Sequence, residues 1–141
     1  MTCYNDGQDI RHVNCSNNSM IKLKRAYDLA QKKDGYRVLI DRLWPRGIKK
    51  SALIIDAWMK ELAPSTKLRK SFGHDPNKWS AFRREYLSEL RSAFAQEKLD
   101  RLAKLGKKRT ITLVYSAKDE EHNDAIVLKA TLDRKIRKLN D

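Results

Sequence analysis

The sequence has few of the residues on which several classes of site depend. Its two cysteines, Cys3 and Cys15, both fall within the first 15 residues, which excludes a disulfide framework and a cysteine metal site. Only five glycines occur in 141 residues, which disfavours a glycine-rich phosphate loop, and no Walker loop, dinucleotide motif or nucleophile elbow is present. No apolar run approaches the roughly 20 residues of a membrane span, and the N-terminus has no signal-peptide core. We therefore expect a cytoplasmic protein with no membrane partner.

Charge is abundant instead, and most of it is positive. Lys and Arg total 31 and Asp and Glu total 18, which is a formal net charge of +13, while 40% of the residues are hydrophobic. This apolar share suits one small domain with a core rather than a disordered chain. A positive balance of this size is typical of proteins with a polyanionic partner, although lysine-rich faces also keep small proteins soluble. No helix-turn-helix, zinc finger or RNA-recognition pattern supports sequence-specific reading.

The first nineteen residues differ from the rest in composition. They are rich in Asn, Ser, Asp and Gly and have no apolar period, which predicts a disordered N-terminal extension over 1–19. A strand-like alternation follows Met20 directly. The sequence therefore predicts a single domain over 20–141.

Apolar periodicity in that domain predicts strands alternating with helices. Strands are expected over 21–27, 36–40 and 110–115. Helices are expected over 51–62, 65–72, 75–94, 97–105 and 119–139. Strands separated by helices indicate an α/β fold, a single domain in which helices pack on a small, largely parallel sheet.

One helix carries a stripe of aromatic and apolar residues at spacings of three and four. Its members are Trp79, Phe82, Tyr86, Leu90 and Phe94. Core packing explains such a stripe more simply than a stacking surface for bases does.

Polar side chains leave the strand over 36–40 together with a stiff backbone. Asp41, Arg42, Trp44 and Arg46 follow it, interrupted by Pro45. Ligands in open parallel sheets bind outside the carboxyl ends of the strands, and arginine forks suit phosphate or carboxylate groups. Trp44 would stack on a ring or close the core, and an Asp–Arg pair that ties the loop to the sheet explains the same residues.

A second polar cluster follows the strand over 110–115. Ser116 and Lys118 precede a helix start, where free backbone N–H groups attract anions. His122 with Glu121 or Asp119 would form an acid–base pair. The acids of this stretch also complement the helix dipole without any further role, and the spacing matches no established metal motif.

The third cluster lies between two predicted helices. His74 precedes Asp75 and a proline, which is a strong helix-start signal. His74 is either a general base oriented by an acid or a residue that fills a tight corner.

Long blocks of the sequence resemble the YeaO-like proteins of the bacterial "domain of unknown function 488" family, over roughly residues 20–135. The blocks that carry the resemblance are 35–47, 62–65, 68–76 and 116–123. The resemblance implies a small cytoplasmic α/β domain and supplies no established activity. Its blocks coincide with the three polar clusters, and family motifs in loops favour a site over a scaffold.

Three hypotheses follow. The first is an enzyme that acts on a nucleotide or nucleic acid without a metal or cofactor, and the second is a non-catalytic nucleic-acid-binding module that uses the outer basic faces. The third is a small-molecule-binding or structural protein whose charge serves solubility. The expected catalytic residues are Asp41, His74, Glu121 and His122, and the expected ligand-binding residues are Arg42, Trp44, Arg46, Ser116, Lys118 and Asn123.

Overall fold

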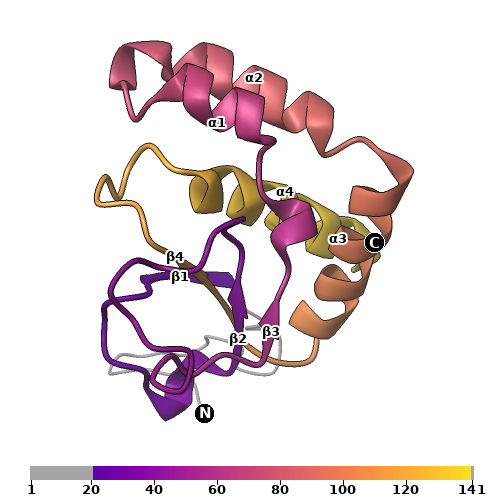
Figure 1. Cartoon of the computed structure of the whole chain (residues 1–141). Coiled ribbons are helices and arrows are strands. Elements are labelled where there is room, and N and C mark those ends of the chain that lie inside the picture. The colour runs from indigo at the N-terminus through magenta and orange to yellow at the C-terminus, as the bar shows by residue number, and fades with distance from the viewer. Residues whose placement is uncertain (1–20, 141) are drawn as a thin grey trace, which may run out of the picture.

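The computed structural model describes residues 21–140 and shows one small sheet with helices packed against it (Figure 1). The strands are β1 (Ile21–Arg25), β2 (Tyr36–Leu39), β3 (Ala57–Trp58) and β4 (Ile111–Tyr115). The α-helices are α1 (Thr66–Phe72), α2 (Trp79–Glu89), α3 (Ala93–Gly106) and α4 (Asp124–Leu139). Short 3-10 turns span Lys32–Asp34, Lys60–Leu62 and Pro76–Lys78. The extension predicted over 1–19 lies outside the described residues.

The four strands form one parallel sheet in the order β1-β4-β2-β3. Leu113 of β4 lies opposite Leu23 of β1 on one side and Val38 of β2 on the other. The prediction of an α/β domain with a small parallel sheet is therefore confirmed. In such a sheet every strand ends at the same edge, which is where the polar clusters were expected to meet.

Apolar side chains cover both faces of the sheet, as a parallel sheet requires. Val38 and Leu113 belong to the main core beneath the helices, whereas their neighbours Leu39 and Val114 point to the other face. That second face is covered by Leu53 and its surroundings, because the connections from β1 to β2 and from β2 to β3 contain no α-helix.

The helix predicted over 51–62 is wrong. The structure has turns there, then β3 and a 3-10 turn. Backbone hydrogen bonds from Asp56 to the Arg37 carbonyl (2.7 Å) and from Met59 to the Leu39 carbonyl (2.8 Å) attach this segment to the sheet edge. Leu53, Ile55 and Trp58 therefore serve the second core, whereas Leu62 belongs to the main core. The apolar spacing of this segment resembled a helix only by coincidence.

Helix α4 begins five residues later than predicted. The side chain of Asn123 accepts a hydrogen bond from Ile126 N at 3.1 Å and caps the helix. Upstream, the carboxylate of Asp119 accepts N–H bonds from Glu121 (2.9 Å) and His122 (3.0 Å). This local turn competes with the helix and holds residues 119–122 as a loop.

The aromatic stripe divides between two helices. Phe82, Tyr86 and Leu90 are buried, and Trp79 packs against the same core. Phe94 is 55% exposed, because α2 ends at Glu89 and a new helix starts after it. Core packing is confirmed for four of the five residues and wrong for Phe94.

Helices α1 and α2 pack against each other at one end of the molecule, across from the loop that follows β4 (Figure 1). Ser65 caps α1 by accepting a hydrogen bond from Leu68 N at 3.1 Å, and Asp75 caps the 3-10 turn before α2 by accepting from Asn77 N at 3.0 Å. This helix pair closes one side of the space beyond the strand ends. Over residues 21–140, no helix has the length and hydropathy that crossing a membrane requires.

Candidate functional site

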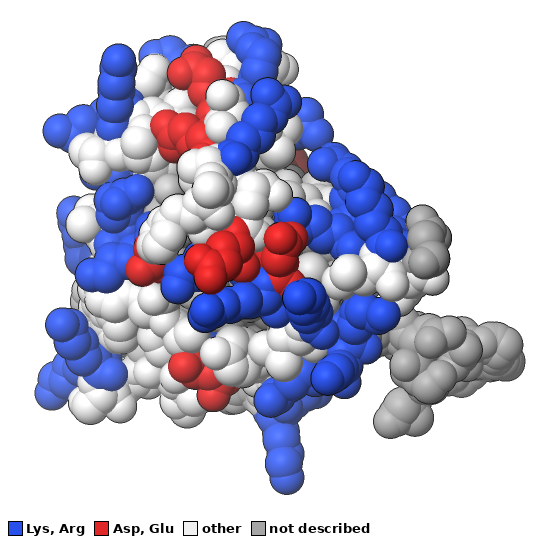
Figure 2. All heavy atoms as spheres, turned by 90° about the vertical axis from the view of Figure 1, so that its right-hand side faces the viewer, with Lys and Arg blue, Asp and Glu red and all other residues white. Residues whose placement is uncertain are grey.

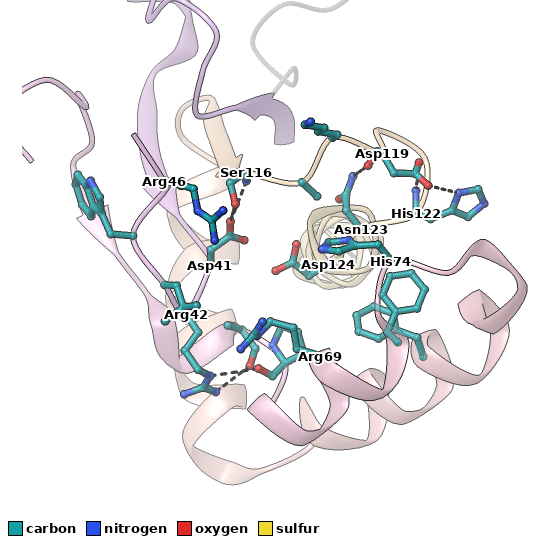
Figure 3. Close-up of a pocket in the computed structure, with 18 of the residues that line it drawn as sticks. Asp41, Arg42, Arg46, Arg69, His74, Ser116, Asp119, His122, Asn123 and Asp124 are labelled. Atoms are coloured by element: carbon teal, nitrogen blue, oxygen red, sulfur yellow. Dashed lines mark hydrogen bonds and ion pairs between the residues drawn. The ribbon is translucent and has the colours of Figure 1, made fainter. Parts of the chain in front are cut away.

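A pocket of about 700 Å³ lies at the carboxyl ends of β2 and β4 (Figure 3). Its walls come from the segments 41–46, 63–64, 69–74 and 116–124, with Tyr27 and Phe82 added. The three polar clusters are thus brought together from distant parts of the chain. Of the ten predicted site residues, nine line the pocket, namely Asp41, Arg42, Trp44, Arg46, His74, Ser116, Lys118, His122 and Asn123.

Asp41 is held firmly at the end of β2. Its carboxylate oxygen Oδ2 accepts hydrogen bonds from Ser116 N at 2.8 Å and from Ser116 Oγ at 2.6 Å. Its backbone carbonyl accepts a further bond from Trp58 Nε1 at 2.7 Å. These bonds fix the Asp41 carboxyl group at the pocket wall.

Asp124, the first residue of α4, places its carboxyl group against that of Asp41, and Figure 3 shows the two side chains pointing toward each other. Burial and the neighbouring Asp41 carboxylate raise the pKa of Asp124 well above its usual range. Two carboxyl groups in hydrogen-bond contact cannot both be ionised without strong repulsion. Asp124 therefore keeps its proton to a higher pH than an isolated aspartate does.

Four basic side chains line the same pocket as this pair. Arg42 donates to the carbonyls of Pro64 (Nε, 3.3 Å) and Ala63 (Nη2, 3.4 Å), which orients its guanidinium at the pocket wall. Figure 3 shows Arg46 beside Asp41 and Arg69 on α1 across the cavity, and Lys118 completes the set. Within the described part of the chain, no carboxylate forms an ion pair with any of the four.

His122 lies at the rim with Asp119. Its Nδ1 is 2.9 Å from Asp119 Oδ2, and its ring meets Trp79 edge-on at 5.4 Å. Hydrogen bonds from Glu121 N and from the His122 side chain lower the pKa of Asp119 below its usual range. Figure 3 shows the His122 ring directed away from Asp124, so the two acid–base groups are separate.

The family of the chain follows from comparison with known proteins. The family model described as "Inactive DUF488-N3 subclade" matches residues 20–141. The chain belongs to this DUF488 subclade.

Two relatives illustrate the DUF488 membership. The uncharacterised protein YeaO of Escherichia coli (strain K12) is 51% identical over 108 residues, covering 77% of this chain and 92% of the relative. An uncharacterised protein of Mycobacterium tuberculosis (strain ATCC 25618 / H37Rv) is 34% identical over 113 residues, covering 80% and 93%. No solved structure gives a significant match. The expected resemblance to the YeaO-like DUF488 proteins is confirmed.

Several predicted site residues of this DUF488 chain have structural duties. Trp44 donates from Nε1 to the Ile48 carbonyl at 2.6 Å and packs edge-on against Trp58 at 5.4 Å, so its ring packs against the second core. Asn123 caps α4 with its oxygen and donates from Nδ2 to the Asp119 carbonyl at 2.8 Å. Glu121 is exposed and does not line the pocket.

His74 occupies an unusual backbone position. It has a φ of 58°, directly after Gly73 with a φ of 55°. Left-handed backbone is costly for a residue with a side chain, and such strain clusters at functional sites. The residue lines the pocket and Figure 3 shows it facing the cavity, which supports a role beyond filling a corner.

Among the charged residues that line the DUF488 pocket, sequence reasoning did not single out Asp124 and Arg69. An aspartate in the first turn of a helix is common because it complements the dipole, and a basic residue on an exposed helix face is equally ordinary. Neither carries a local signal, and only the packing of α1 and α4 around the strand ends brings them to Asp41. Over residues 21–140, no group of three or more His, Cys, Asp or Glu side chains is arranged to hold a metal ion.

Proposed function

We propose that this protein binds a small phosphate-bearing ligand, a nucleotide by chemical class, in the pocket at the strand ends. The observation that carries the proposal is the set of four basic side chains that line the same pocket as the carboxyl pair, namely Arg42, Arg46, Arg69 and Lys118. Guanidinium groups match phosphate oxygens in a two-pronged geometry, which makes such a set a natural anion site.

The charge balance of the pocket supports an anionic ligand. Four Lys and Arg side chains line the pocket against three carboxyl groups, those of Asp41, Asp119 and Asp124. The raised pKa of Asp124, caused by burial and the neighbouring Asp41 carboxylate, lowers the negative charge of the pocket further. A dianionic phosphate therefore enters a pocket of opposite net sign, in surroundings less polar than water.

The remaining walls suit an organic group attached to the phosphate. Phe72, Phe82, Pro64 and Leu43 contribute apolar surface, and Tyr27 stands at the margin. The volume of about 700 Å³ is in the range of small-molecule pockets and exceeds what inorganic phosphate needs. A ring system or sugar fills this space better than a bare ion does.

The description of the matching family contains the word "inactive". Binding without turnover is therefore the form of the proposal that we favour. Catalysis on a nucleotide or nucleic acid, expected from the sequence with Asp41, His74, Glu121 and His122 as candidates, stays a second candidate. The observation in its favour is the carboxyl group of Asp124, whose pKa is raised by burial and by the neighbouring Asp41 carboxylate. A carboxyl group with a raised pKa beside a second one is an arrangement that can supply an acid and a base together.

Titration calorimetry tests the proposal with adenosine monophosphate, guanosine monophosphate and inorganic phosphate as probes. An Arg46→Gln/Arg69→Gln variant is expected to lose most of the affinity, about tenfold or more. An Arg83→Gln/Arg134→Gln variant removes the same charge from exposed positions outside the pocket and is expected to bind as the wild type does. Absence of any binding, or equal losses in both variants, would contradict the proposal. Chromatography of the same mixtures after incubation separates binding from turnover.

The basic faces of the molecule give less support to nucleic-acid binding. On the face shown in Figure 2, acidic side chains lie among the Lys and Arg side chains, so the positive charge is not continuous. In the C-terminal half of the chain, Lys135 pairs with Asp100 at 2.8 Å and Arg101 with Glu97 at 3.5 Å. A polyanion needs a run of unopposed cations. If the sequence prediction of nucleic-acid binding holds, charge reversal of Arg134, Lys135, Arg137 and Lys138 abolishes it and the Arg46/Arg69 variant does not.

A further inference from the structure

The proposed function gives the carboxyl pair no role, because a phosphate is repelled by carboxylates and held by cations. Asp41 and Asp124 nevertheless line the same cavity, and Figure 3 shows their carboxyl groups pointing toward each other there. They come from the end of β2 and the start of α4, which are far apart in the sequence. A pair of acids costs stability in a fold, so its chemistry in the pocket needs an account of its own.

We infer that Asp41 and Asp124 together bind a hydroxyl group of the sugar that is attached to the ligand's phosphate. The inference rests on the proposed function, which assigns the phosphate to the basic side chains. In this arrangement Asp124 donates its proton to the hydroxyl oxygen, and the hydroxyl hydrogen is donated to Asp41. A phosphorylated sugar, alone or within a ribonucleotide, carries both groups that the pocket is built to hold.

The asymmetry of the pair follows from its surroundings. Ser116 donates two hydrogen bonds to Oδ2 of Asp41, and within residues 21–140 no N–H group donates to the other oxygen of that carboxylate. Asp124 receives backbone N–H groups at the start of α4, but burial and the Asp41 charge outweigh them. One acid is therefore fixed as the acceptor and the other as the donor, which is the pattern that a hydroxyl group complements.

The groups that face Asp124 come from every side of the pocket. Tyr86 of α2 lies within electrostatic range of both carboxyl groups, and its hydroxyl donates a hydrogen bond to the Leu62 carbonyl. The other charged and titratable groups that share the cavity are Arg42, Arg46, Arg69, His74, Lys118, Asp119 and His122. The cations favour ionisation of both carboxyl groups, whereas the buried tyrosine does not. The carbon-13 titration described below measures the pH at which Asp124 loses its proton.

A metal ion bridging the two acids is the main competing account. No third His, Cys, Asp or Glu in the described chain completes a metal cluster at the pair. Two donors from Ser116 already occupy one oxygen of Asp41, and cations line the same pocket as the pair. These features favour a shared proton over a shared cation.

Calorimetry with ribose 5-phosphate and inorganic phosphate tests the inference on three proteins. The wild type is expected to bind ribose 5-phosphate about tenfold or more tightly than phosphate near pH 7, since one added bond to a charged group has that effect. This preference is expected to fall as the pH rises and the pair loses its proton. Asp124→Asn keeps a donor that does not titrate, so its preference is expected to persist at high pH.

Asp119→Asn is the matched control, because it removes a carboxylate from the same pocket without touching the pair. It is expected to show the pH profile of the wild type. Carbon-13 NMR of labelled aspartate gives a readout without ligand. One carboxyl signal is expected to titrate at a pH well above the ordinary aspartate range in the wild type and in Asp119→Asn. This titration is expected to be absent in Asp124→Asn.

The outcomes separate the inference from the proposed function. Phosphate binding with no preference for ribose 5-phosphate, or one pH profile for wild type and Asp124→Asn, overturns the inference and leaves the phosphate site standing. Binding of ribose 5-phosphate that requires added Mg²⁺ overturns it in favour of a bridging metal. Failure of both probes and of the nucleotides overturns the two together.

Discussion

Nη1 of Arg37 donates a hydrogen bond to the Asp34 carboxylate at 2.7 Å, and both side chains are almost fully buried. Alternation along β2 places Arg37 on the sheet face opposite the helices. Burial alone would raise the pKa of Asp34, but hydrogen bonds from Gln31 N, Lys24 and Arg37 outweigh it and lower that pKa below its usual range. The second face of the sheet thus contains a polar cluster beside its apolar core.

Replacing Asp34→Asn is expected to destabilise the fold by about 3 kcal/mol, because the charge of Arg37 is left buried without a counterion. The pKa of Asp34 is lowered in the folded state, so its contribution is present above the unfolded value and is lost as the pH falls through the folded value. Urea unfolding near pH 7 and near pH 3 measures both effects. Asp133→Asn removes a more exposed ion pair with Lys129 and is expected to cost less than about 1 kcal/mol. Equal losses in the two variants would contradict the assignment.

Substitutions at two glycines with positive φ distinguish the stability cost of backbone strain from that of a steric clash. A Cβ at Gly35 would lie 2.3 Å from the Thr110 carbonyl oxygen, whereas a Cβ at Gly47 would meet nothing within 4 Å. Gly47→Ala is expected to cost about 1 kcal/mol for its left-handed backbone alone. Gly35→Ala is expected to cost several times more, on the order of 3 kcal/mol, because β2 must move away from the start of β4. Thermal unfolding of the two variants tests the difference, and a similar loss in both would show that the clash is relieved elsewhere.

His74 gives a test of strain kept for function. Because its φ is 58°, His74→Gly is expected to leave stability unchanged or to raise it by about 1 kcal/mol. The same change is expected to weaken nucleotide binding by removing the imidazole from the pocket. His74→Ala keeps the backbone strain and removes the ring, so it is expected to lose binding without gaining stability. If the His74→Gly protein binds nucleotide as the wild type does, His74 only fills the tight corner and has no role in binding.

The carboxyl pair predicts an unusual pH dependence of stability. The pKa of Asp124 is raised in the folded state, so the folded protein holds a proton that the unfolded chain releases. This pair therefore disfavours folding increasingly as the pH rises above the ordinary aspartate range, until the folded pKa is passed. Asp124→Asn is expected to be more stable than the wild type at pH 8 by a larger margin than at pH 5. Denaturant midpoints at the two pH values measure the change, and a constant margin would refute a shared proton.

The sequence predicts those parts of the fold that depend on local signals. The alternation in β1 and β4, the Ser65 cap of α1 and the Asp75–Pro76 start are properties of neighbouring residues, and all were found. The errors fall where tertiary contacts overrule such signals. Residues 51–62 have helical spacing but pair with β2, and Asp119 holds a turn where first-turn acids suggested helix α4.

For the site, the sequence by itself determined the clusters that follow β2 and β4 and the one after α1, because ligand-binding residues of parallel sheets collect in the loops after the strands. It also determined the family. Tertiary structure alone decided which side chains face one another. Asp124 reaches Asp41 and Arg69 faces both only because α4 and α1 pack around the strand ends. The resulting proton is a property of neither residue alone, since it arises from burial and repulsion between groups that are distant along the chain.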